Sequence, residues 1–221
     1  MDATAEPFPA DPPRDCDRCP RLVDYRAANA VAHPDAFNAP VPGWGDSGGW
    51  LAIVGLAPGL NGAARTGRPF TGDASGDLLH ATLAKFELSN GAYAGAADDG
   101  LELNGVFITN ALRCVPPGNK PDSAEIHACR PFLAAQLAGL ANLQVVVALG
   151  EIAHQSAVKA CGGKLPKAPF GHGNVHRLHG QRFGALTLID SFHPSRLNTS
   201  TGRLTLEMFD AVFAAALAAR A

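Results

Sequence analysis

The run Leu51-Ala-Ile-Val-Gly-Leu56 is apolar throughout and ends in Ala57-Pro58-Gly59, where proline and glycine stop a regular element. A short apolar run bounded by turn residues is typical of a strand that is buried on both faces. Similar runs follow at 105–109, 145–149 and 185–189. Segments with helical spacing separate these runs, and this alternation predicts a mostly parallel sheet covered by helices on both faces.

Five stretches have the spacing or composition of helices. Between them, residues 33–49 are rich in proline and glycine and are expected to form a loop, whereas residues 89–100 are expected to form a surface insertion. Residues 162–184 are rich in glycine and histidine, and we expect a small hairpin there. The expected helices cover 15–32, 75–88, 122–140, 151–160 and the alanine-rich tail that starts at Gly202.

Together these elements predict the α/β class, with a single three-layer αβα domain around a central, mostly parallel sheet of four strands. That domain spans residues 15–221 and follows a flexible, acidic and proline-rich tail at residues 1–14. The chain has 221 residues, of which 47% are hydrophobic, so it is long enough and apolar enough to bury a full core.

The net charge of −2 gives no overall signal for nucleic acid, so any contact with DNA has to rest on local patches and backbone amides. The N-terminus lacks the basic start and apolar centre of a secretion signal. No apolar run approaches the length that spans a membrane. We therefore expect a cytoplasmic protein that does not bind a membrane, and a monomer as the simplest assembly.

Three segments of unusual sequence each follow a predicted strand. They are Gly55-Leu-Ala-Pro-Gly59, Asn110-Ala-Leu-Arg-Cys114 and His193-Pro-Ser-Arg-Leu-Asn198. In open α/β sheets, ligands bind outside the carboxyl ends of the strands. We therefore expect these three segments to converge on one edge of the sheet and to form a site there.

The cysteines are placed like metal ligands. Cys16 and Cys19 form a C-x2-C pair, which can hold one edge of a metal site, and Cys114 and Cys129 can complete a set of four thiolates. Such sites select iron–sulfur clusters or zinc, and the spacing does not separate these two. The alternative is that the thiols are buried and inert. Cys161 stands alone and is assigned no role.

Four motifs, taken in order along the chain, resemble the uracil-DNA glycosylase superfamily and in particular its family 5, or UDGb, type. The resemblance covers roughly residues 15–210, and the Cys16–Cys19 pair with the following Pro20-Arg-Leu22 agrees with it. The motifs are Gly55-Leu-Ala-Pro-Gly59, Arg65-Thr-Gly-Arg-Pro-Phe-Thr-Gly-Asp73, Asn110-Ala-Leu-Arg-Cys-Val-Pro-Pro-Gly-Asn-Lys120 and His193-Pro-Ser-Arg-Leu-Asn198.

This resemblance implies a glycosylase that flips a uracil or another deaminated base, such as hypoxanthine, out of duplex DNA and hydrolyses its N-glycosidic bond. It also implies a structural [4Fe-4S] cluster, and thus decides between iron and zinc. By matching positions, the cluster ligands are Cys16, Cys19, Cys114 and Cys129.

The resemblance also assigns roles at the reacting base, and each has a purely structural alternative. His193 would donate to a uracil carbonyl oxygen, or be held against Pro194 as a structural histidine. Asn110 would bond the polar edge of the base, or cap the strand end. Phe70 would stack on the base, or belong to the core. Asp73 would position the attacking water or stabilise the cationic sugar, or cap a helix.

Further residues are expected to contact the base or the DNA. Leu197 would wedge into the vacated base stack, or simply pack within its loop. The first motif has no carboxylate or amide, unlike in other branches of the superfamily, so it offers backbone groups. The expected contact residues are Gly55, Ala57, Gly59, Ser195, Arg196, Leu197 and Asn198, and possible phosphate contacts are Arg65, Arg68, Arg113 and Lys120.

Two other functions remain open from the sequence. The first is a superfamily member that binds damaged DNA with little or no catalysis, which the first motif without a polar side chain favours. The second is a zinc-stabilised hydrolase of small nucleosides or nucleotides. Tight binding of uracil-containing DNA without base release would indicate the first, and a colourless zinc protein that acts on free nucleosides would indicate the second.

Overall fold

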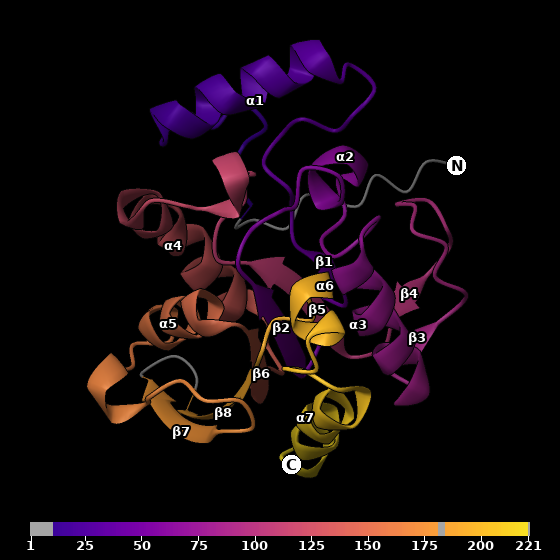
Figure 1. Cartoon of the computed structure of the whole chain (residues 1–221). Helices are drawn as coiled ribbons and strands as arrows, with labels where there is room; N and C mark the ends of the chain where they lie inside the picture. The colour runs from indigo at the N-terminus through magenta and orange to yellow at the C-terminus, as the bar shows by residue number, and fades with distance from the viewer. Residues whose placement is uncertain (1–10, 181–183, 221) are drawn as a thin grey trace.

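A six-stranded sheet runs through the middle of the molecule in the computed structural model, which describes residues 11–180 and 184–220 (Figure 1). Its four central strands are parallel, as predicted. In spatial order they are β5 (Val106–Asn110), β2 (Leu51–Gly55), β6 (Val145–Leu149) and β8 (Gly184–Ser191). The expected α/β class and αβα layers are confirmed.

The expected number of four strands is wrong, because an antiparallel strand lies at each edge of the sheet. β1 (Trp44–Gly45) pairs with β5, and β7 (Val175–Gly180) pairs with β8. Only the first strand of this hairpin lies within 162–184 as expected, because its second strand is the fourth predicted strand. β1 has only two residues inside a segment rich in proline and glycine, so no alternating pattern reveals it. β3 (Ser89–Asn90) and β4 (Glu102–Leu103) form a separate two-stranded sheet.

The helices lie close to the expected ranges, and α1 starts later because Pro20 occupies its first turn, where a missing N–H costs nothing. The short α2 and α6 were not expected. Among the described residues, no helix combines the length and apolarity needed to cross a membrane. The helices are α1 (Pro20–Ala32), α2 (Ala63–Thr66), α3 (Ala74–Lys85), α4 (Ser123–Gly139), α5 (Glu151–Ala160), α6 (Arg196–Ser200) and α7 (Leu206–Ala218), with short 3-10 turns at Pro117–Asn119 and Leu165–Lys167.

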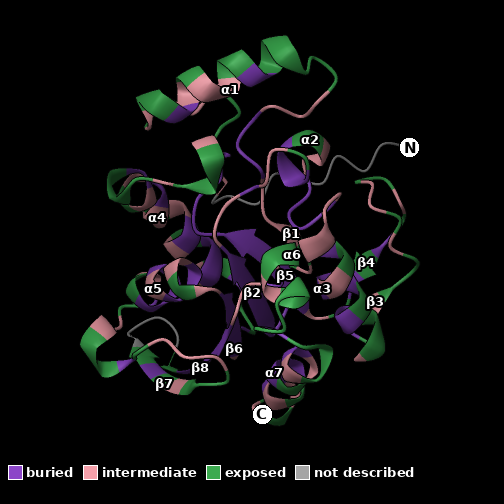
Figure 2. Cartoon of the chain, in the orientation of Figure 1, coloured by how far each residue is buried: buried purple, intermediate pink, exposed green. Residues whose placement is uncertain are grey.

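The core has two halves, one on each face of the sheet. Along β2, Leu51 and Ile53 pack with residues of α3 and α7, whereas Ala52 and Val54 pack with residues of α4 and α5. Successive side chains of a strand point to opposite faces, so a strand between two helical layers is apolar at every position. Figure 2 shows the strands buried between the layers, and most of α1 exposed.

A buried polar network ties the start of the described chain to the sheet. The guanidinium of Arg113, which is 1% exposed, donates to the side-chain oxygen of Gln136 and lies 3.3 Å from an Asp11 carboxylate oxygen. Gln136 also accepts from Thr109 and donates to Asp11 at 2.6 Å. Arg113 therefore cannot contact a phosphate, and that expectation is wrong. Asp11 also accepts from the backbone N–H of Gly43.

Replacing Gln136 with methionine, which has a similar volume but no amide, is expected to lower the free energy of unfolding by roughly 3 kcal/mol, because buried partners lose their hydrogen bonds. Chemical denaturation measures this. Gln155→Met on the partly exposed α5 is the matched control and should change stability by less than about 0.5 kcal/mol. Equal losses in both variants would contradict the assignment of the network as a structural tie.

Candidate active site

The segments that leave β2, β5 and β8 surround one cavity of about 280 Å³. This is close to the lower end, roughly 300 Å³, of pockets that hold small molecules. The convergence predicted from the three strand ends therefore occurs. The cavity is lined by Leu56, Ala57, Pro58, Gly59, Ala63, Phe70, Asp73, Ser75, Asn110, Asn119, His193 and Ser195.

Asn110 is the last residue of β5 and presents an unused acceptor to the cavity. The parallel register places it beside Gly55, and the pairing continues where the N–H of Ala111 donates to the Gly55 carbonyl at 2.9 Å. Asn110 is 3% exposed, and its Oδ1 has no hydrogen-bond partner among the described residues. Buried acceptors are nearly always bonded, so this oxygen suits a ligand that donates a hydrogen.

Gly55 lets two cavity side chains approach each other. A Cβ atom at this position would overlap Oδ1 of Asn110 and would lie 2.6 Å from the ring of Phe70. Any other residue would have to displace one of them. The first motif thus shapes the cavity because its first residue, Gly55, has no side chain.

Phe70 holds an unfavourable backbone conformation at the cavity wall. Its φ is 51°, in the left-handed region that bulky residues rarely adopt. Its ring stacks beside that of His193, with centroids 6.0 Å apart and planes at 28°. Phe70 is 8% exposed, so it packs with the core and also lines the cavity. Strain of this kind persists only where the surroundings hold it, which is common at binding sites.

Asp73 caps α3, as one of its two alternatives predicted, and its two carboxylate oxygens face different partners. Oδ1 accepts from the N–H groups of Ser75 and Gly76 at 3.0 and 3.1 Å and so caps α3. Oδ2 faces the chain at Gly59 and Gly62, where an added Cβ would approach it closely. One oxygen therefore anchors the helix, and the other is left for the cavity.

His193 lies half-buried in the cavity wall and is held by its own loop. Burial lowers the pKa of the imidazole, and the nearby charge of Asp73 opposes this shift. The amide of Asn198 donates to the His193 carbonyl at 2.8 Å, and Ser195 caps α6 by accepting from the N–H of Asn198. Ser195 and Asn198 thus shape the loop, whereas Leu197 is 71% exposed.

Of the arginines expected to contact DNA, Arg196 is exposed and Arg68 is buried. Arg196 is exposed on α6, outside the cavity lining. Arg68 is 4% exposed and forms two hydrogen bonds to Asp99, at 2.7 and 2.8 Å, so the expectation that it contacts phosphate is wrong. Arg65 and Lys120 remain accessible to solvent.

Asn119 lines the cavity and was not singled out from the sequence, although Pro-Gly before it signals a turn. Its φ is 56°, and its turn is fastened by Arg21 of α1, which donates to the Lys120 carbonyl at 3.2 Å. Arg21 also forms two hydrogen bonds to Glu125 of α4, at 2.8 and 2.7 Å. Contacts from α1 and α4 therefore hold this part of the cavity rim.

A histidine–aspartate network was also missed. Nδ1 of His154 lies 2.6 Å from Asp190, and its Nε2 lies 2.8 Å from the carbonyl of Ala168. Both partners can accept; burial lowers the pKa of His154, but hydrogen bonding to Asp190 outweighs this and raises the pKa overall. Asp190 also accepts from His176 and the N–H of Gly171. The only sequence signal was a carboxylate inside the apolar run of β8.

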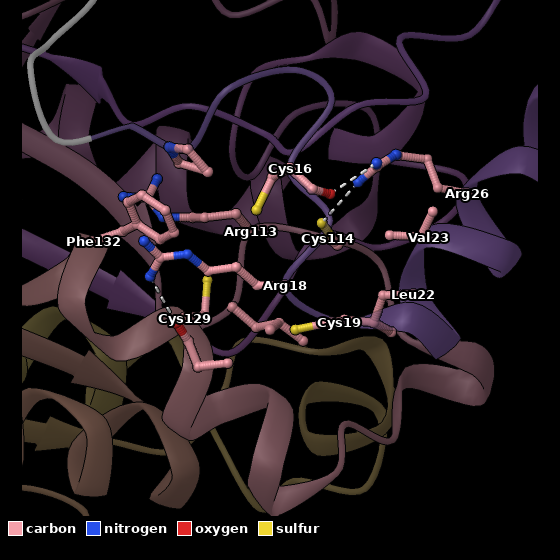
Figure 3. A pocket seen from close by; sticks show the side chains of 13 residues that line it. Cys16, Arg18, Cys19, Leu22, Val23, Arg26, Arg113, Cys114, Cys129 and Phe132 are labelled. Atoms are coloured by element: carbon pink, nitrogen blue, oxygen red, sulfur yellow. Dashed lines mark hydrogen bonds between the residues drawn. The ribbon is translucent and has the colours of Figure 1, made fainter.

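Four cysteines from three segments line a second cavity (Figure 3). Cys16 and Cys19 precede α1, Cys114 follows β5, and Cys129 lies in α4. Cys129 is buried, the other three are half-buried, and all are free thiols. Cys161 lies elsewhere, in the core beside α5.

The surroundings of these thiols suit a group bound by four sulfurs. Leu22 and Phe132 supply apolar walls, and Arg26 donates to Sγ of Cys114 at 3.5 Å. Burial, with a smaller contribution from Cys129, raises the pKa of Cys114 to about 11, although Arg26 opposes the rise. Among the described residues, the three side chains whose ligand atoms lie close enough together to hold a metal ion are His154, His176 and Asp190, and they do not form a four-thiolate site.

Comparison with known proteins places this geometry in a family. A family model described as "Uracil DNA glycosylase superfamily" matches residues 42–217. The chain is 44% identical over 206 residues to "Type-5 uracil-DNA glycosylase" of Mycobacterium tuberculosis, covering 90% of this chain and 75% of that protein. The protein of the same description from Thermus thermophilus is 44% identical over 200 residues, or 88% of this chain and 89% of the relative.

The chain belongs to the uracil-DNA glycosylase superfamily. The resemblance seen in the motifs is thereby confirmed, and its type-5 character agrees with the relatives above. A "Type-4 uracil-DNA glycosylase" of Pyrobaculum aerophilum is 34% identical over 155 residues, covering 70% of this chain and 65% of that protein. In this member of the superfamily, four separate motifs meet at one cavity.

The imidazole of His193 is expected to titrate below its ordinary value of 6.5, because burial disfavours the charged ring. Asp73→Asn keeps a good helix cap but removes a charge that raises the pKa, so the midpoint should fall further. NMR of the ring nitrogens across a pH series measures both midpoints. A midpoint above 6.5, or an upward shift in the variant, would contradict the described environment.

Proposed function

We propose that this chain is a monofunctional glycosylase that removes uracil, and other deaminated bases such as hypoxanthine, from duplex DNA. The observation that carries the proposal is the meeting of Phe70, Asp73, Asn110 and His193 around one cavity of a size suited to a single base. Its relatives are described as uracil-DNA glycosylases, which supports the same reaction.

Base binding follows from the cavity wall. A base in a duplex is out of reach, so it is rotated out of the stack at a cost of a few kcal/mol. Phe70 offers a ring face on which the flipped base stacks, worth about 1–3 kcal/mol. Leu197, exposed on the short α6 next to the cavity loop, is placed to enter the gap left in the duplex.

The bond to the sugar breaks with its electrons leaving on the base. His193, neutral because burial lowers its pKa, donates a ring N–H to a base carbonyl oxygen and stabilises the negative charge that develops there. The unpaired Oδ1 of Asn110 accepts from the N–H on the polar edge of the base. Both contacts favour uracil-like edges over apolar ones.

Water completes the reaction at the sugar. Oδ2 of Asp73, which is not used in capping α3, accepts a proton from water as the water oxygen bonds to the sugar carbon, and its charge stabilises the cationic sugar. The cavity lining described here includes no lysine to form a Schiff base. The product is therefore an abasic site in an uncut strand.

We further propose that Cys16, Cys19, Cys114 and Cys129 hold a [4Fe-4S] cluster. Four free thiols in one cavity with apolar walls and an N–H donor fit such a group. When bound, the cluster supplies structural bonds rather than electrons for the reaction. It would join the segment before α1, the loop after β5 and α4. Arg21 of α1 binds Glu125 of α4 and the Lys120 carbonyl, which lies next to Asn119 at the cavity rim.

The partner follows from the reaction. DNA contact is proposed at the exposed side chains around the cavity, which include Arg65, Lys120 and Arg196. A monomer is proposed as the simplest assembly. A cytoplasmic location, where DNA is accessible, is part of the same proposal.

Base release from a duplex oligonucleotide with a single uracil is expected, seen as an alkali-labile site. His193→Ala should lower the single-turnover rate about 100- to 1,000-fold, because a preorganised donor is lost, while the circular dichroism spectrum stays unchanged. The wild-type protein and an undamaged duplex are the controls. Tight binding without base release from any lesion would instead indicate a damaged-DNA binding protein.

Anaerobically purified protein is expected to be brown and to contain about four iron and four acid-labile sulfide ions per chain. Cys114→Ala should lose most of both, since one of four ligands is missing. Cys161→Ala is the matched control and should keep them, because Cys161 lies outside the cysteine cavity. Stoichiometric zinc without sulfide would overturn the assignment of the cluster.

A further inference from the structure

The strained Phe70 is held from behind by a histidine that the proposed reaction does not use. Nε2 of His80, in the second turn of α3, lies 3.1 Å from the backbone carbonyl oxygen of Phe70. A carbonyl can only accept, so Nε2 carries the proton and donates it. His80 is 1% exposed, and its other ring nitrogen has no hydrogen-bond partner among the described residues.

The protonation state of His80 is fixed by its surroundings. Burial, together with the charge of Arg68, lowers its pKa to about 4. The ring is therefore neutral at neutral pH, with its proton on the nitrogen that faces Phe70. The ring carries no charge that could interact with the base, and its hydrogen bond to Phe70 does not change with pH near neutrality.

The segment expected to be a surface insertion, residues 89–100, also holds this turn. The ring of Tyr93 stacks on His80 with centroids 4.3 Å apart, and its hydroxyl accepts from the N–H of Gly72 at 3.0 Å. Asp99 binds Arg68 with both carboxylate oxygens, and Arg68 lies 4.5 Å above the Trp44 ring. The insertion is therefore part of the support of the active-site motif.

The packing leaves the turn little room to relax. A Cβ at Gly76 would overlap the carbonyl oxygen of Phe70, so α3 lies directly against that peptide group. Phe70 is thus confined by the carbonyl bond to His80, by the bond from Gly72 to Tyr93, and by the ring contacts near Gly55. Such confinement is what keeps a bulky residue in the left-handed region.

We propose that His80 and Tyr93 are positioning residues for base recognition, which hold the turn from Phe70 to Gly72 so that the phenyl ring faces the flipped base. This inference rests on the proposed function, because it assigns the stacking surface to a base. Neither residue touches the base. Their effect is on the affinity for the uracil nucleotide, and it passes entirely through Phe70.

A double-mutant cycle tests the proposal with KM and kcat measured separately on uracil-containing duplex DNA. His80→Leu removes the donor, and it should raise KM about tenfold with little change in kcat, as expected for lost stacking that serves bound substrate and transition state alike. His80→Gln can place an amide N–H near the position of Nε2 and should restore most of the affinity. Tyr93→Phe keeps the ring but loses the hydroxyl, and it should raise KM by less than His80→Leu does.

The decisive comparison is made in a Phe70→Ala background. There His80→Leu should cause no further rise in KM, because the side chain through which it acts is gone. Thr82→Val is the matched control: it removes a buried hydroxyl from the same helix, bonded to the Leu78 carbonyl at 3.0 Å, and should leave KM unchanged.

The proposal would be overturned if His80→Leu raised KM equally in the wild-type and Phe70→Ala backgrounds. It would also be overturned if His80→Leu left KM unchanged and lowered kcat only in proportion to the fraction of unfolded protein. Failure of the proposed function is seen separately, as a wild-type protein that releases no uracil. In that case the same cycle, read as Kd for duplex DNA with and without uracil, still decides whether His80 acts through Phe70.

Discussion

The parallel pairing of β2 with β5 is the constraint on which the site depends. It places Gly55 beside Asn110, and the missing side chain of Gly55 allows Asn110 and Phe70 to meet at the end of the sheet. A shift of this register by one residue would turn Asn110 to the other face and bring a larger side chain between them. The pairing of β2 with β5 therefore determines the geometry of the cavity.

The two cavities are linked through the chain that leaves β5. Asn110 ends that strand in the base cavity, Cys114 lies four residues on in the cysteine cavity, and Asn119 returns to the base cavity. Arg21 connects the returning turn to α1 and α4. A group that joins the four thiols would therefore brace the rim of the base cavity from outside, without contact with the reacting atoms.

The sequence was sufficient for the layers, the four parallel strands and the meeting of the strand-end motifs, because each of these depends on local periodicity and on a general rule of α/β sheets. It was insufficient for β1, which is too short to show a pattern. It also did not reveal that Arg68 and Arg113 are buried, since their ion pairs with Asp99 and Asp11 join residues far apart in the chain. His80 and Tyr93 were missed for the same reason: their partners are backbone groups of a distant turn.

The start of α3 inside the active site also sets a dimension. Asp73 caps the helix beside the place proposed for the sugar, and His80, seven residues later, supports the ring proposed to face the base. Seven residues of helix rise by about 10 Å and complete nearly two turns, which returns both groups to the same side. The helix therefore fixes the distance between the group proposed for the sugar and the group that supports the ring proposed for the base. The distance between the two groups is thus set by the backbone of α3 and not by side-chain rotation.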